Sequence, residues 1–222
     1  MIFQIEKTKI QFVQFFDMHE KAAEAIAEAK TVGLVDLAFT ADSDKSTFAG
    51  TTAKAMELIG NKLVAWVDHH KNVRWPEFSD DPRYHLAEAP SCPRLVEIGE
   101  LTGCDLVLAH GAMDGILAAA KALGYTYPKL KADADAADTR RGELSGFARM
   151  ANDALRADMA DDETRYQIVA VIAGLLSESV LREKAERYAE VQARTNELAK
   201  GYKVQGQVAY VDATEVSGSY DL

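Results

Sequence analysis

The segment Val64-Ala65-Trp66-Val67-Asp68-His69-His70 places one carboxylate and two imidazoles directly after an apolar run. An uncharged run of aliphatic and aromatic residues predicts a buried strand over residues 63–67. The sheet would hold side chains at the end of such a strand in place, and Asp and His both bind divalent transition metal ions. The segment therefore predicts a strand that delivers three metal-competent groups to one edge of a sheet.

Two further apolar runs end in the same way. Residues 32–35 lead into Asp36, and residues 106–109 lead into His110, with Asp114 four positions later. In an open α/β sheet, ligands collect beyond the carboxyl ends of the parallel strands, where residues far apart in sequence meet. For each residue alone, a solvated strand end or a cap of the next helix is the alternative interpretation. Three runs with the same ending favour one shared site.

Strands and helices alternate along the first part of the chain, which predicts an α/β fold with a mostly parallel sheet and helices on both faces. The further strands are expected over residues 9–16 and 105–109, and the helices over residues 17–30, 51–59, 94–101 and 116–123. Asp17 and Glu20 form a capping-box pattern at the start of the first helix. Residues 71–93 contain several prolines and are expected to form a long loop.

After residue 129 the pattern becomes helical, which predicts a helical C-terminal segment. One helix should carry Asp133, Asp135 and Asp138, a second should cover residues 146–157, and a long amphipathic one should cover residues 164–199 and end at Gly201. Residues 207–212 alternate as a short strand. The expected organisation is one domain over residues 1–200, with an α/β core over 9–128 and a helical part over 129–200, followed by a strand and tail over 201–222.

Composition limits the classes of partner. The 222 residues carry a formal net charge of -10 and a pI of about 5.0, which argues against binding to long duplex nucleic acid or to an anionic membrane surface. A small anionic substrate remains compatible if a metal ion supplies positive charge. Cys92 and Cys104 form neither a C-x-x-C pair nor a disulfide framework, so we expect a soluble protein of the reducing cytoplasm. The composition leaves a homodimer open.

Asp68-His69-His70 after a buried strand resembles the signature of the DHH phosphoesterase family, which includes RecJ-type nucleases, nanoRNA and cyclic-dinucleotide phosphodiesterases and family II pyrophosphatases. His110-Gly111-Ala112-Met113-Asp114-Gly115 resembles the family's H-x-D-x-D-G motif. Val35-Asp36-Leu37, Ala89-Pro90-Ser91 and the acidic stretch 132–138 resemble further family segments. The H-x-D-x-D-G strand normally opens the chain and here follows the DHH segment, so we interpret the sequence as a rearranged DHH catalytic domain. No signature of the family's C-terminal substrate-binding domain is visible.

The resemblance implies a Mn²⁺-dependent phosphoesterase, with two ions, that hydrolyses a phosphodiester in a short oligonucleotide or small nucleotide. The implied metal ligands are Asp36, Asp68, His69, His110, Asp114 and either Asp135 or Asp138. Asp68 and His70 are the implied catalytic residues: Asp68 would bind metal or orient a histidine, and His70 would face the substrate phosphate.

The resemblance also points to groups that would bind the substrate. Gly115 would let a phosphate approach the following helix N-terminus. The nearest basic residues are Lys71, Arg74, Arg140 and Arg141, for each of which a solvated surface cation is the alternative. Two other functions are open. One is a pyrophosphatase-like hydrolase, and the other is a degenerate module that binds a nucleotide or protein partner without hydrolysis, because Ala112 replaces an Asp of the motif.

Overall fold

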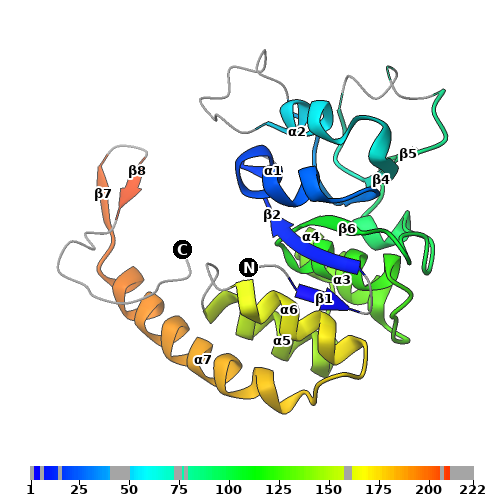
Figure 1. Ribbon diagram of the computed structural model, residues 1–222. Helices are drawn as coiled ribbons and strands as arrows, with labels where there is room; N and C mark the ends of the chain where they lie inside the picture. The colour runs from blue at the N-terminus through cyan, green and yellow to red at the C-terminus, as the bar shows by residue number, and fades with distance from the viewer. Residues whose placement is uncertain are drawn as a thin grey trace.

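A sheet with the strand order β1-β2-β6-β3-β4-β5 forms the centre of the protein (Figure 1). The computed structural model describes residues 3–5, 8–14, 17–40, 51–72, 77, 80–157, 162–205 and 208–210. The strands of the central sheet are β1 (Phe3–Ile5), β2 (Thr8–Val13), β3 (Val32–Val35), β4 (Leu63–Asp68), β5 (Tyr84–Leu86) and β6 (Leu106–His110). Within this sheet, only β1 and β2 pair antiparallel, and β2, β6, β3, β4 and β5 are parallel neighbours. The predicted α/β fold is therefore confirmed.

Helices cover both faces of this sheet, because successive strand residues point to opposite faces and both sets are apolar. Leu106 and Leu108 pack with α1 (Met18–Glu28) and α2 (Thr52–Ile59), whereas Val107 and Ala109 pack on the other face. That second face is covered by α3 (Met113–Ala122), α4 (Leu130–Thr139), α5 (Gly146–Ala157) and α6 (Asp162–Ile172).

The chain then continues into α7 (Ser179–Lys200), which packs along α5 and leads to the hairpin of β7 (Lys203–Gln205) and β8 (Val208–Tyr210) (Figure 1). Gly201 ends α7 as predicted. Within the described parts of the chain, no helix combines the length and hydrophobicity needed to cross a membrane.

The strand order brings the three predicted strand ends together. β3 lies between β6 and β4, and Val35 is in register with Ala109 on one side and with Val67 on the other. The residues that follow these three positions are Asp36, His110 and Asp68. The carboxyl ends of three adjacent parallel strands therefore present the side chains that sequence analysis selected.

The helix predicted over residues 94–101 is wrong. A short 3-10 turn, η4 (Cys92–Arg94), is followed by turns, and Gly99 adopts a left-handed conformation with φ of 78°. The N–H groups of Gly99 and Leu101 donate to the carbonyls of Lys121 and Ala122 at the end of α3. This segment combines local turn hydrogen bonds with hydrogen bonds to a neighbouring helix, in place of a regular helical series of its own.

The single helix predicted over residues 164–199 is also wrong, because the chain forms α6 and α7 with a turn between them. Gly174 in that turn has a left-handed φ of 72°, and the N–H of Leu175 donates to Ala170 O. This pattern of a left-handed glycine and a backward hydrogen bond ends a helix. Asp17 precedes α1 without capping it, since its Oδ1 accepts a hydrogen bond from the N–H of Gln14.

Three strands were not predicted. β5 lies inside the expected loop of residues 71–93, β1 adds the antiparallel edge, and β7 precedes the strand expected over residues 207–212. Each contains three residues, a length at which an alternating pattern carries little signal. β5 extends the sheet beyond β4 and brings the following segment, residues 87–92, alongside the end of β4, where the N–H of Ala87 donates to Asp68 O.

Candidate metal centre

Asp36 directly follows β3 and has a strained backbone conformation. Its φ of 58° lies in the left-handed region, which non-glycine residues rarely adopt, and its N–H donates to Val67 O of β4 at 2.9 Å. The side chain is buried, with 1% of the residue exposed. Strain of this kind persists only where surrounding structure enforces it and is concentrated at functional sites. The turn places the Asp36 carboxylate among the side chains that follow β4 and β6.

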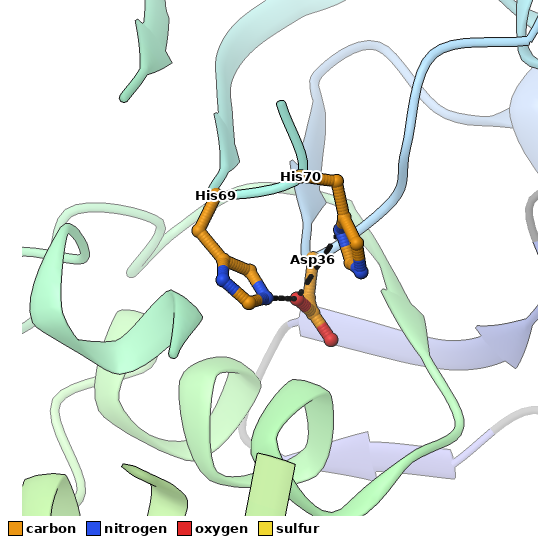
Figure 2. A group of neighbouring side chains, drawn as sticks. All are labelled: Asp36, His69 and His70. Carbon is orange, nitrogen blue, oxygen red and sulfur yellow. Dashed lines mark ion pairs between the residues drawn. The ribbon is translucent and has the colours of Figure 1, made fainter. Parts of the chain in front are cut away.

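The Asp36 carboxylate lies between two imidazoles from different strands. Its Oδ1 is 3.2 Å from Nε2 of His69 and its Oδ2 is 3.4 Å from Nδ1 of His110 (Figure 2 shows the His69 side). The same Nε2 of His69 is 3.4 Å from Oδ2 of Asp114, which lies in the first turn of α3. Residues from β3, β4, β6 and α3 thus meet in one cluster.

His69 is oriented by the segment that follows β5. Its Nδ1 lies 3.0 Å from the carbonyl oxygen of Ala89, which can only accept, so Nδ1 carries a hydrogen and Nε2 faces Asp36 and Asp114. Metal-binding histidines are commonly held in this way by a carbonyl behind the ring. Burial lowers the pKa of His69, but Asp114 and Asp36 outweigh it and raise the pKa to about 11. A metal ion at Nε2 would compete with that proton.

His70 is held differently. Its Nδ1 lies 2.7 Å from Oδ1 of Asp68, and the hydrogen bond to this carboxylate raises the pKa of His70 although burial lowers it. The His70 side chain is 41% exposed, whereas that of His69 is 7% exposed. Nδ1 of His70 is also 3.9 Å from Oδ1 of Asp36 (Figure 2). Asp68 therefore orients His70 at the rim of the cluster, while His69 lies inside it.

The cluster contains buried polar atoms that have no hydrogen-bond partner among the described residues. These atoms are both oxygens of Asp36, Oδ2 of Asp68, Oδ2 of Asp114 and Nε2 of His69. Burying a carboxylate that has no partner costs roughly several kcal/mol of folding free energy. Buried carboxylates are therefore normally paired with a cationic side chain or bound to a metal ion. Divalent cations would supply a partner for the atoms of Asp36, His69 and Asp114, which belong to ligand groups of suitable geometry, so this donor set fits metal ions.

Two groups of three residues have the geometry to hold an ion. Asp36, His69 and His70 form one, and His69, Asp114 and Asp138 form the other; within each group the ligand atoms lie within 4.8 Å of one another. The groups share His69. The protein therefore has overlapping acidic and imidazole groups that can bind metal, and the mixture of carboxylate and imidazole suits Mn, Zn or Fe.

The alternatives Asp135 and Asp138 are separated by the structure. Asp138, near the end of α4, reaches the cluster, and burial, followed by the charge of Asp114, raises its pKa. Asp135 instead accepts a hydrogen bond from Ser91 Oγ at 2.6 Å and forms an ion pair with Arg94. Asp135 thus fixes the turn at the start of η4 and lies outside both ligand groups.

The predicted substrate-binding residues are dispersed. Lys71 is exposed and forms an ion pair with Glu88 at 2.7 Å, and Arg141 is exposed outside the pocket described below. Arg74 lies outside the described residues. Arg140 lines the pocket. Of the four predicted cations, the structure therefore places Arg140 beside the cluster.

Gly115 is buried beneath Asp36. A Cβ at this position would lie 2.8 Å from Oδ2 of Asp36 and even closer to His110 O. The absence of a side chain lets the first turn of α3 pack against the Asp36 carboxylate. The approach of a phosphate at Gly115 stays a prediction, and the close contacts with Asp36 and His110 give a packing reason for the glycine.

A pocket of about 750 Å³ opens next to the cluster, with Asp114 and Asp138 in its wall. Its other polar lining residues include Arg140, Arg149 and Arg156. Arg149 and Arg156 were not among the predicted site residues. Arg149 and Arg156 are seven residues apart, and this spacing predicts that they share one exposed face of a helix. The spacing does not predict that this face is turned toward the cluster.

Two supporting contacts were also missed. Gln14 Oε1 accepts a hydrogen bond from Nε2 of His110 at 2.8 Å, which directs Nδ1 of that ring to Asp36. The buried Arg165 of α6 donates from Nε to Gly111 O at 3.0 Å and so holds the turn after β6. Gln14 acts by orienting His110, and Arg165 acts by holding Gly111. Neither contact depends on a recognisable sequence motif.

The fold and the cluster define the chain as an α/β protein with a candidate divalent-metal centre at the carboxyl edge of its parallel sheet. No family model matches the chain, and comparisons with curated proteins and with solved structures also give no match.

Proposed function

We propose that this chain is a metal-dependent phosphoesterase that hydrolyses a phosphodiester in a short oligonucleotide or small nucleotide, with Mn²⁺ as the working ion. The observation that carries the proposal is the convergence of buried ligand atoms of Asp36, His69 and Asp114, which contact one another but form no hydrogen bond among the described residues, next to a pocket lined in part by arginines. The resemblance of Asp68-His69-His70 and His110–Gly115 to DHH phosphoesterase motifs supports the same reaction. Two free, buried cysteines accord with the reducing cytoplasm that we propose as its compartment.

The chain's own geometry suits a centre with two ions. The two oxygens of Asp36 face different histidines, His69 and His110, so this carboxylate can bridge where an imidazole cannot. Asp114 and Asp138 complete the ligands on the side of His69. Bound divalent ions would supply a water of lowered pKa and neutralise negative charge on a phosphoryl group.

His70 is the group that we assign to the substrate. Asp68 holds the ring through Nδ1, so Nε2 is the atom that the half-exposed ring presents outside the cluster. An oriented imidazole next to a phosphoryl oxygen can hold or transfer a proton there. Asp68 is buried and contributes by fixing this orientation.

One observation favours a second function, a module that binds a nucleotide without hydrolysing it. Ala112 occupies the N-cap of α3 and lines the pocket, where its methyl group offers no metal ligand and no cap. If the remaining ligands hold an ion too weakly for turnover, the pocket would still bind an anion.

The test is a parallel assay of the purified, Mn²⁺-loaded protein against dinucleotides, cyclic dinucleotides, 3′,5′-bisphosphates and pyrophosphate. We expect hydrolysis of at least one phosphodiester, abolished by a chelator and by His69→Ala. Turnover of pyrophosphate alone would replace the proposal with a pyrophosphatase. Retained metal without any turnover would favour the binding module.

A further inference from the structure

The pocket beside the metal centre has a wall of mixed charge. Asp114 and Asp138, which belong to the cluster, line it together with three arginines, Arg140, Arg149 and Arg156. Its volume of about 750 Å³ lies in the range of roughly 300–1,000 Å³ that is typical of small-molecule sites. A ligand in this pocket would therefore contact the metal centre and the arginines together.

The arginines are presented by the way α5 packs. Arg149, Asn152 and Arg156 follow one another at spacings of three and four residues, so they lie on one face of the helix, and all three line the pocket. Ala148 and Ala151 on the other side of α5 are fully buried. The rotation of α5 is thus fixed by its apolar side, and its basic side must face the pocket.

Two of the three guanidinium groups have no ion-pair partner in the part of the chain that the structure describes. Arg140 and Arg149 form no ion pair there, although Asp153 lies near Arg149 and Arg156 and offsets part of their charge. Arg156 stacks over the ring of Tyr188, with its central carbon 5.4 Å from the ring centroid. Stacking uses the face of a guanidinium group, whereas anions bind at its edge.

Tyr188 is itself fixed. It is buried in α7, with 3% exposed, and its hydroxyl oxygen accepts a hydrogen bond from Gln192 Nε2 at 3.2 Å. The aromatic ring therefore holds Arg156 at the pocket before any ligand binds. Arg156 would then lose less side-chain entropy when an anion binds there.

We propose that Arg140, Arg149 and Arg156 form an anion subsite that binds a second, terminal phosphate of the substrate, separate from the phosphoester at the metal centre. The substrate class is then a small phosphoester that carries an additional phosphate, and α5 determines this specificity. The assignment of the reaction rests on the proposed function; the anion subsite itself rests on the arginines and the pocket.

Binding measured without metal tests the anion subsite separately from the proposed metal-dependent hydrolysis. In the presence of a chelator, a 5′-phosphorylated dinucleotide and the same dinucleotide without the 5′-phosphate are titrated into the protein by calorimetry. The wild-type protein should bind the phosphorylated ligand more tightly. Arg149→Ala should weaken that binding about 10- to 100-fold, the usual loss for one charged hydrogen-bonded contact, and leave the other ligand unaffected.

Arg182→Ala is the matched control, because Arg182 is an exposed arginine of α7 that does not line the pocket. It should behave as the wild type. Arg149→Lys should recover part of the affinity, which a purely structural role of Arg149 would not predict. Equal affinity of the wild type for the two ligands, or unchanged binding by Arg149→Ala, would overturn the subsite. Selective binding without Mn²⁺-dependent hydrolysis would support the subsite and contradict the proposed reaction.

Discussion

Oδ1 of Asp68 lies 2.7 Å from Nδ1 of His70, and this contact gives the second histidine of the pair an orientation independent of the first. His69, between them in sequence, turns Nε2 to Asp36 and Asp114 and donates from Nδ1 to Ala89 O. Adjacent side chains at a strand end point in different directions. Two neighbouring imidazoles can therefore serve one site in different ways.

The two histidines should separate metal binding from turnover. We expect His69→Ala to lower both the metal content and the rate, because His69 is shared by both ligand groups. His70→Ala should retain metal and lose roughly 10²- to 10⁴-fold in rate, the range for one positioned acid, base or electrostatic group. Elemental analysis after desalting, combined with steady-state kinetics, measures the two effects. Because His70 also lies near Asp36, equal metal loss in both variants would mean that the two residues share the role of ligand.

Mn²⁺ should stabilise the folded protein, because only the folded state brings the ligands together. At a free concentration of 100 times Kd, the stabilisation would be about 2.7 kcal/mol, or a rise in Tm of roughly 5–10 °C at this chain length. Asp36→Asn should abolish the rise. Asp135→Asn makes the same chemical change outside both ligand groups and should preserve it. Thermal denaturation with and without Mn²⁺ provides the measurement, and loss of the rise in Asp135→Asn would place the ion elsewhere.

Gly115→Ala should destabilise the protein by about 1–3 kcal/mol, the usual cost of overpacking a buried position. The new methyl group would displace either the Asp36 carboxylate or the His110 carbonyl. Gly146→Ala is the control, because no atom lies within 4 Å of its Cβ position, and we expect a change within roughly ±0.5 kcal/mol. Urea denaturation of the metal-free proteins compares the two. A neutral Gly115→Ala would show that α3 can move away from Asp36.

Both cysteines should resist alkylation in the native protein at pH 8. Burial raises the pKa of Cys104 to about 11, with a smaller contribution from Asp105, and complete burial raises the pKa of Cys92. With a pKa of about 11, roughly one thiol in a thousand is ionised at pH 8, compared with about a quarter of ordinary thiols. Labelling with iodoacetamide, followed by mass spectrometry, should show slow native modification, faster at higher pH, and complete modification in urea. Rapid labelling of Cys104 in native buffer would contradict its described burial.

The strand ends could be predicted because each depends on a short local pattern, an apolar run followed by Asp or His. Parallel topology then brings Asp36, Asp68 and His110 to one edge, and the strand order β6-β3-β4 makes them neighbours there. The choice between Asp135 and Asp138 could not be predicted. Both lie on α4, and only the docking of that helix directs one to His69 and the other to Arg94.

The wrong helix over residues 94–101 and the unpredicted role of Arg149 have a common physical cause: both depend on contacts between residues far apart in sequence. The segment 94–101 has a helical pattern, but two of its N–H groups donate to the end of α3, where the buried Lys121 also donates to the carbonyls of Pro93 and Val96. The role of Arg149 depends on how α5 packs. No local pattern contains this information, because tertiary contacts override local preference.

β2 and β3 follow one another in the chain, yet β6 lies between them in the sheet. During synthesis, Asp36 and His69 therefore leave the ribosome before Leu106–His110, the strand that completes their surroundings, has been made. Until that strand inserts, β2 and β3 both present open edges, and late pairing of this kind is slow and prone to association with other chains. The ligand group of His69, Asp114 and Asp138 can accordingly form only in chains whose β6 has already been made, whereas Asp36, His69 and His70 come from the ends of β3 and β4 alone.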